Sequence, residues 1–162
     1  MTIDKQLLSA GAANVTIRID INAPIAKTWR LMIDDIGQWW RQDFLCCERS
    51  MGMHLEARVG GMLVERTEGE GCGYLWGHVI SFQPEHQLAY VAQIVPPWGG
   101  PAQSVVQIAL APDEDRPAEA TVLTLTDSLI GHVSDHLMSS LAEGWGQLYG
   151  EGGLKTHVES ST

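Results

Sequence analysis

The chain has 162 residues, of which 44% are hydrophobic and 19% charged, as is usual for a soluble globular protein. Twenty acidic against ten basic residues give a formal net charge of −10, which excludes a nucleic-acid-binding role and adhesion to anionic membranes, because both need a basic face. A domain of this length buries roughly 70% of its unfolded-state surface, so we expect a single domain over residues 1–162 that needs no metal or disulfide for stability.

The N-terminal segment lacks the basic stretch and long apolar run of a secretion signal, and no apolar run approaches the roughly 20 residues that span a bilayer. Of the three cysteines, Cys46 and Cys47 are adjacent and Cys72 is distant, so no CxxC pair indicates a disulfide framework or a zinc site. We therefore expect a cytoplasmic protein that does not insert into a membrane.

The first elements are a strand and two short helices. Residues 14–22 alternate apolar and polar side chains, which predicts a half-buried strand. Pro24 favours a helix start, and that helix should run to about Ile33 before a second short helical turn. This turn ends at Trp39 and Trp40. We expect Trp39 to pack in the core and Trp40 to face a cavity.

Regular strands with short turns then predict an antiparallel meander. Gly60–Gly61 forms a plausible hairpin turn between the first two of these strands. The six predicted strands cover residues 54–59, 62–66, 74–82, 88–95, 104–110 and 120–126.

The C-terminal segment is predicted to be a long amphipathic helix with Ser134 as its N-cap. Its apolar residues recur every three to four positions: Val133, Leu137, Leu141, Trp145 and Leu148. Gly144 and Gly146 weaken such a helix, so we attribute them to close packing or to room for a ligand. The elements together predict an α+β fold, with a curved antiparallel sheet wrapped around the long helix and two short helices after the first strand.

Four segments resemble, in order, the START-like (SRPBCC) superfamily, and within it the branch of heat-shock-protein ATPase activator homologues. The segments are APIAKTWRLMIDDIGQWW, ARVGGMLVER, YLWGHVISFQPEHQLAY and EGWGQLYGEGGL, and the resemblance covers about residues 13–155. It implies a helix-grip fold with a deep, mostly apolar cavity between sheet and helix. Members bind lipids, sterols, polyketides or other hydrophobic molecules, some are cyclases, aromatases or hydrolases, and the branch's founding members act on a chaperone. One departure from the family pattern is that Gly144, Gly146, Gly152 and Gly153 make the last helix unusually rich in glycine, which bears on how its C-terminal turn ends.

The strand over residues 74–82 can present either of two faces to such a cavity. In one phase Tyr74, Trp76 and His78 point inward; in the other Leu75 and Val79 do, because Gly77 is a candidate bulge. Taking the first phase, we predict a ligand site with aromatic walls and a few polar groups. Its residues are Trp40, Tyr74, Trp76, His78, Tyr90, Trp98, Ser140 and Trp145.

His78 is the candidate catalytic residue, because an imidazole exchanges protons near neutral pH. His132 and His136 have the i, i+4 spacing of zinc-binding histidines but lack the glutamate and a third ligand, so we expect no metal and no cofactor. Cys46 and Cys47 are expected to be small buried hydrophobic residues.

Acidic residues near the predicted cavity mouth, Asp34, Asp35 and Asp43, are expected to form a solvated rim, and Asp127 to cap or pair locally. Trp98 lies in the rigid loop PPWGGP, which is a candidate lid or partner contact.

Three functions are compatible with these features. The first is binding of a small hydrophobic or aromatic ligand in the central cavity. The alternatives are a polyketide-cyclase-like or hydrolase-like enzyme that uses the same cavity, and a co-chaperone-like module that binds a protein partner. The sequence leaves the oligomeric state and the identity of the ligand open.

Overall fold

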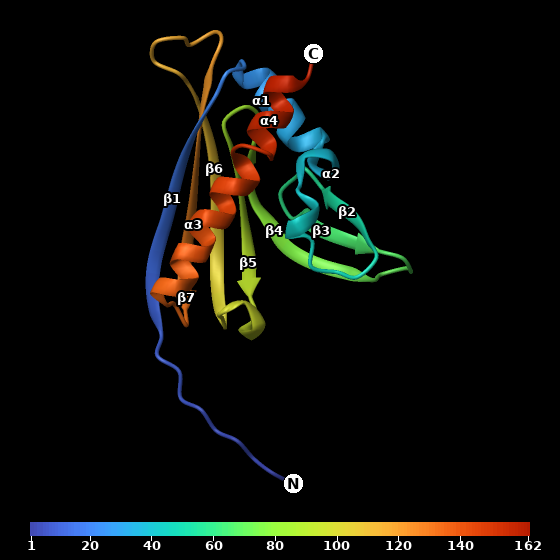
Figure 1. The fold of residues 1–162 in the computed structure, drawn as a ribbon, viewed down its shortest axis with the longest axis vertical. Coiled ribbons are helices and arrows are strands. Elements are labelled where there is room, and N and C mark those ends of the chain that lie inside the picture. The colour runs from blue at the N-terminus through green and yellow to red at the C-terminus, as the bar shows by residue number, and fades with distance from the viewer.

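The computed structural model, which describes residues 1–162, contains a seven-stranded antiparallel sheet that curves around the C-terminal helix (Figure 1). The strand order is β1-β7-β6-β5-β4-β3-β2. This confirms the predicted helix-grip α+β fold. The strands are β1 (Gly11–Ile21), β2 (Ser50–Leu55), β3 (Met62–Thr67), β4 (Gly73–Gln83), β5 (Gln87–Ile94), β6 (Ala102–Pro112) and β7 (Thr121–Gly131). The helices are α1 (Ile25–Asp34), α2 (Ile36–Trp39), α3 (Asp135–Tyr149) and α4 (Leu154–Ser160), with short 3-10 turns at Gln42–Phe44 and Pro96–Trp98.

The helix α3 lies along the concave side of the sheet beside β1 (Figure 1). Ser134 is its N-cap as predicted, since the hydroxyl oxygen accepts a hydrogen bond of 3.1 Å from the backbone N–H of Leu137. The inward phase of β7 supplies Leu123, Leu125 and Leu129 to the core beneath the helix. The core continues to α1, α2 and α4 at the end of the sheet where the two short helices lie.

The glycine-rich end of the C-terminal helix is where the chain breaks and starts α4. A β-carbon on Gly150 would lie 2.3 Å from the carbonyl oxygen of Gly146, and one on Gly153 would lie 1.9 Å from that of Leu148. Such distances are far inside van der Waals contact, so only glycine lets the chain pass its own last turn. Of the glycines that depart from the family pattern, Gly152 and Gly153 lie at this helix break, whereas Gly144 and Gly146 lie inside α3.

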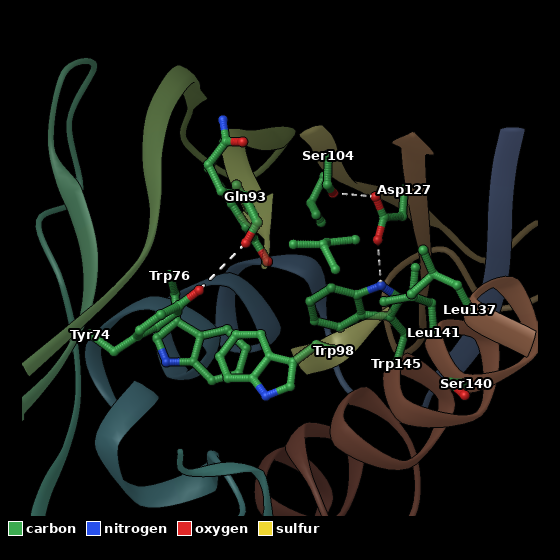
Figure 2. Close-up of a pocket in the computed structure, with 14 residues that line it drawn as sticks. Tyr74, Trp76, Gln93, Trp98, Ser104, Asp127, Leu137, Ser140, Leu141 and Trp145 are labelled. Carbon is green, nitrogen blue, oxygen red and sulfur yellow. Dashed lines mark hydrogen bonds between the residues drawn. The ribbon is translucent and has the colours of Figure 1, made fainter. Parts of the chain in front are cut away.

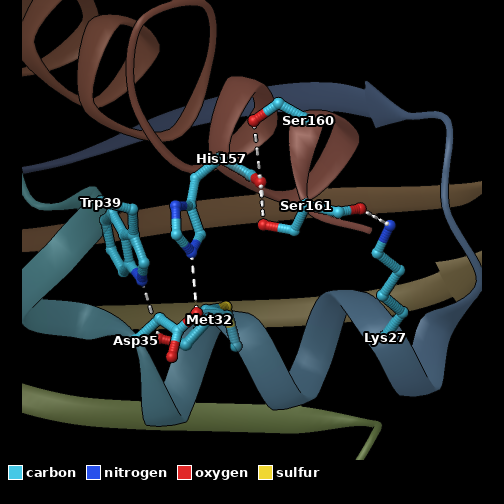
Figure 3. Close-up of polar contacts among 7 residues, drawn as sticks. All are labelled: Lys27, Met32, Asp35, Trp39, His157, Ser160 and Ser161. Carbon is cyan, nitrogen blue, oxygen red and sulfur yellow. Dashed lines mark hydrogen bonds and ion pairs between the residues drawn. The ribbon is translucent and has the colours of Figure 1, made fainter.

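Polar contacts tie α4 back to α1 and α2 (Figure 3). The Lys27 ammonium donates to the Ser161 carbonyl at 2.6 Å, and His157 Nε2 lies 2.8 Å from Asp35 Oδ2. Asp35 is therefore half-buried and paired, whereas we had expected it in a solvated rim. The Trp39 indole donates to the Met32 carbonyl at 3.0 Å, which fixes α2 against α1. These contacts close one end of the sheet.

The first strand of the meander is displaced from its predicted range of 54–59, because β2 ends at Leu55. Its register with β3 pairs Met53 with Glu65 and Leu55 with Leu63, which leaves residues 56–61 as a connection. The turn at Gly60–Gly61 is confirmed: Gly60 has φ +77°, and a β-carbon on Gly61 would lie 2.1 Å from the Glu56 carbonyl oxygen.

None of the helices combines the length and apolar character needed to cross a membrane.

Candidate functional site

A cavity of about 260 Å³ lies between α3 and the concave side of β4–β7 (Figure 2). Ten of its 14 lining residues are hydrophobic, and the mouth is open to solvent beside the exposed Gln93, Trp98 and Ser140. It is lined by Tyr74, Trp76, Tyr90, Ala92, Gln93, Ile94, Trp98, Ser104, Val106, Asp127, Leu137, Ser140, Leu141 and Trp145. Six residues that the sequence singled out are among them: Tyr74, Trp76, Tyr90, Trp98, Ser140 and Trp145.

Three aromatic side chains form one wall of this cavity. Trp76 of β4 stacks on Trp98 with ring centroids 6.0 Å apart and an interplanar angle of 21°, and Tyr74 packs edge-on against Trp98 at 5.0 Å. The Tyr74 hydroxyl donates to the Gln93 carbonyl at 3.4 Å, so the wall is fixed to β5 (Figure 2). Trp98 remains 43% exposed, which places the PPWGGP loop at the mouth.

A bulge in β4 decides which residues face the cavity. Register with β3 pairs Val64 with Leu75 and Leu63 with Gly77, so Trp76 is an extra residue and the alternation changes phase there. Tyr74 before the bulge and Trp76 at the bulge line the cavity; after the bulge the inward residue is Val79. Each of the two predicted phases therefore holds for part of the strand.

The prediction that His78 belongs to the ligand site is wrong, because this change of phase turns the side chain outward. His78 is exposed and is absent from the cavity lining. A group on the outer face cannot reach a molecule inside the cavity, so His78 is also withdrawn as the catalytic candidate.

Trp40 is likewise misplaced by the prediction. Both indoles of the tryptophan pair are buried, Trp39 at 3% and Trp40 at 4% exposure, so neither is left at a rim. Trp40 does not line the cavity; it packs edge-on against Trp76 with centroids 5.2 Å apart. It therefore supports the aromatic wall, and its buried Nε1 has no hydrogen-bond partner.

Asp127 is the carboxylate of the cavity and was missed as a site residue. It is 1% exposed, and its two oxygens accept hydrogen bonds from the Ser104 hydroxyl and, at 2.9 Å, from the Trp145 indole (Figure 2). Burial raises the pKa of Asp127, and the two hydrogen bonds offset only part of that effect. The sequence carried a signal: Asp127 stands in the same inward phase of its strand as Leu123, Leu125 and Leu129.

Tyr90 contributes its ring and a buried phenol to the same cavity. A β-carbon on residue 77 would lie 2.6 Å from the Tyr90 ring, so Gly77 makes room for it. The hydroxyl lies beside the Tyr149 side chain but makes no hydrogen bond of acceptable geometry within the protein. Burial, followed by the nearby Tyr149 and Asp127, holds the pKa of Tyr90 well above its usual range, so the group is a neutral phenol.

A second buried carboxylate, Glu65, holds the aromatic wall from behind. Its oxygens accept from the backbone N–H groups of Cys46 and Cys47 at 3.0 and 2.9 Å, from the Cys46 thiol at 3.1 Å and from the Trp76 indole at 3.3 Å. Burial alone would raise the pKa of Glu65, but these hydrogen bonds outweigh it and lower the pKa to about 2.

The expectation that Cys46 and Cys47 are buried is wrong, because Cys46 is exposed and Cys47 half-buried. Their sulfurs and a Glu65 oxygen lie within 4.8 Å of one another, close enough to meet at a metal ion. Burial and the neighbouring carboxylate raise the pKa of the Cys46 thiol, however, and thiolates are what metals bind. The cluster of Cys46, Cys47 and Glu65 is explained by its structural role, which is to hold the loop before β2 against Glu65.

No family model matches this chain, and no curated protein matches it either. Solved structures do. An uncharacterised protein from Rhizobium leguminosarum is 18% identical, with a TM-score of 0.62 over 96% of this chain and 100% of that one. Ara h 8.0201 is 8% identical, with a TM-score of 0.66 over 93% and 100%. Txn09, an anthrahydroquino-γ-pyrone synthase, is 20% identical, with a TM-score of 0.51 over 90% and 96%.

These likenesses agree with the fold that the sequence resemblance implied. The chain has the helix-grip architecture, with the sheet wrapped around α3. At such low identity they establish the fold alone.

Proposed function

We propose that this protein binds a small hydrophobic or aromatic molecule in the cavity between α3 and strands β4–β7. The observation that carries the proposal is the cavity itself: ten hydrophobic residues surround an opening that contains one carboxylate. Largely apolar pockets with a few polar groups are typical of small-molecule sites. The volume of about 260 Å³ exceeds the roughly 150 Å³ of an apolar cavity that holds benzene, so a ligand of two or three rings fits best.

Asp127 favours an enzyme as the second candidate function. A buried carboxyl group with a raised pKa is suited to proton transfer, and here it would take the role that the sequence suggested for His78. A cyclase-like or hydrolase-like reaction would therefore depend on Asp127. The synthase Txn09 shares the fold, which is compatible with this candidate.

The co-chaperone-like alternative is supported by an exposed apolar groove and not by the cavity. Met51, Met62 and Leu75 are exposed along one groove over β2–β4, outside the cavity, and could bind a protein partner. From the sequence alone, we also propose that the protein belongs to the branch of heat-shock-protein ATPase activator homologues and that it is cytoplasmic.

Two measurements test ligand binding. Native mass spectrometry of the purified protein, followed by denaturation, would identify a co-purifying molecule. The uncharged dye N-phenyl-1-naphthylamine, whose fluorescence rises in apolar surroundings, would report on an empty cavity. We expect either a stoichiometric passenger or saturable dye binding; the absence of both would overturn the proposal.

A matched pair of variants places the dye. Ser140 lines the cavity from α3, whereas its neighbour Ser139 is exposed and does not. Ser140→Trp should fill the mouth and weaken dye binding at least about tenfold, and Ser139→Trp should leave it unchanged. Equal effects of the two substitutions would show that the dye binds elsewhere.

A further inference from the structure

We propose that the ligand is an uncharged aromatic molecule that carries a hydroxyl group, and that Tyr90 and Asp127 bind this group together. The inference rests on the proposed ligand-binding function and names the chemical class. It also predicts that aromatic carboxylates and other anions are rejected.

Charge in the cavity excludes anions. Its lining contains no lysine, arginine or histidine, and its one carboxyl group is that of Asp127. An anion would lose its hydration without gaining a counter-charge, and it would face a second carboxyl group. The formal net charge of −10 opposes its approach as well.

Tyr90 and Asp127 lie in one row across three strands. Tyr90 of β5 pairs with Val106 of β6, and Val106 pairs with Asp127 of β7. Directly paired residues project from the same face of a sheet, at a spacing of about 4.8 Å per strand. All three line the cavity, so a molecule lying over Val106 contacts the phenol on one side and the carboxyl group on the other.

The hydrogen-bonding capacity of the two side chains defines the group they bind. The Tyr90 hydroxyl is buried beside the Tyr149 side chain but makes no geometrically acceptable hydrogen bond to it or to any other protein group, which leaves a donor to be satisfied. Each oxygen of Asp127 accepts one hydrogen bond from the protein and retains a second lone pair. A ligand hydroxyl accepts from Tyr90 through its oxygen and donates to Asp127 through its hydrogen, so it meets both needs at once.

Aromatic rings suit the remaining surface. The Trp145 indole is held by its hydrogen bond to Asp127, and the Trp76 indole by its hydrogen bond to Glu65. Both rings are thereby fixed in orientation beside the row of Tyr90, Val106 and Asp127. Fixed aromatic faces favour flat rings, since they bind them without a further loss of side-chain freedom.

Displacement of phenylnaphthylamine by three probes with one ring system tests the class: naphthalene, 2-naphthol and 2-naphthoate. We expect naphthol to bind about tenfold more tightly than naphthalene, as one or two buried hydrogen bonds give. Naphthoate should bind more weakly than naphthalene. Naphthoate binding as tightly as naphthol would overturn the inference while leaving the proposed function intact; absence of dye binding and of any co-purifying ligand would count against both.

Conservative variants assign the effect to the two residues. Tyr90→Phe keeps the ring and removes the donor, so the preference for naphthol over naphthalene should fall by about tenfold. Asp127→Asn removes the carboxylate, so the difference in affinity between naphthol and naphthoate should become smaller. His78→Ala, on the outer face, serves as the control and should change neither ratio. Preferences that survive in both cavity variants would contradict the assignment.

Discussion

Asp127 occupies a buried position where a leucine would pack well. Its burial predicts in which direction the stability of the protein changes with pH. The folded state raises the pKa of this carboxyl group, so folding takes up a proton above the ordinary pKa of an aspartate, near 4. The associated stability is present below pH 4 and is lost as pH rises through the folded-state pKa. We therefore expect Asp127→Asn to be the more stable protein at pH 7, with the difference closing toward pH 4.

Urea unfolding at several pH values measures this difference. Asp4→Asn is the control, because Asp4 lies in the exposed N-terminal segment and its removal changes the net charge by the same amount. If both substitutions stabilise equally, relief of the net negative charge explains the effect and the buried position of Asp127 does not.

Glu65 makes the opposite prediction, because its pKa is lowered to about 2 from an ordinary value of 4.5. Its contribution to stability is present above pH 4.5 and is lost as pH falls from there toward 2. Glu65→Gln should lower the free energy of unfolding at neutral pH by about 2 kcal/mol, since a charged acceptor of several hydrogen bonds becomes a neutral one. Near pH 2 the variant and the original protein should be equally stable.

The same variant has a local readout at Cys46. In the original protein its thiol donates to Glu65, and burial and the carboxylate raise the pKa of the thiol. Glu65→Gln should therefore speed modification of Cys46 by a disulfide reagent at pH 7. An unchanged rate together with unchanged stability would show that Glu65 does not hold this loop.

At the scale of elements, alternation and turn residues predicted the number of strands in the meander but not the face of β4. The sequence places Trp76 and Gly77 side by side without saying which is the extra residue. Pairing decides it, since Leu63 opposes Gly77 and the Tyr90 ring needs the space above Gly77. That ring comes from the next strand, so no reading of residues 74–82 alone could have excluded His78. The burial of Asp127, by contrast, could have been predicted from the sequence, because this acid alternates with the apolar residues Leu123 and Leu125 along one strand.

Two glycines of the C-terminal segment, Gly146 and Gly153, should have opposite effects on stability when each is replaced by alanine. Gly146 lies inside α3 with open space around a would-be β-carbon, so Gly146→Ala should stabilise by roughly 0.5–1 kcal/mol through helix propensity. At Gly153 the β-carbon would lie 1.9 Å from the Leu148 carbonyl oxygen, so Gly153→Ala must distort the break and should destabilise by about 2 kcal/mol or more. Urea unfolding of both variants checks the signs; stabilisation by both would mean that α3 and α4 can join into one helix.

At the scale of the whole molecule, the sheet encloses a cavity instead of packing fully against α3. Buried core residues on β6 and β7 support one end of the cavity, while its mouth is bounded by partly exposed side chains. A ligand that fills it adds apolar contacts that only the folded chain can make, so binding and stability are linked.

The link gives a quantitative expectation for thermal unfolding. At a free concentration of phenylnaphthylamine 100 times its Kd, the folded state gains about 2.7 kcal/mol, which for a chain of this size raises Tm by roughly 5–10 °C. Below saturation the shift should follow the logarithm of dye concentration. Ser140→Trp, with its mouth filled, should show a much smaller shift, whereas Ser139→Trp should match the original protein. A shift that is the same in all three proteins would place the dye outside the cavity, because Ser140 lines the cavity and Ser139 does not.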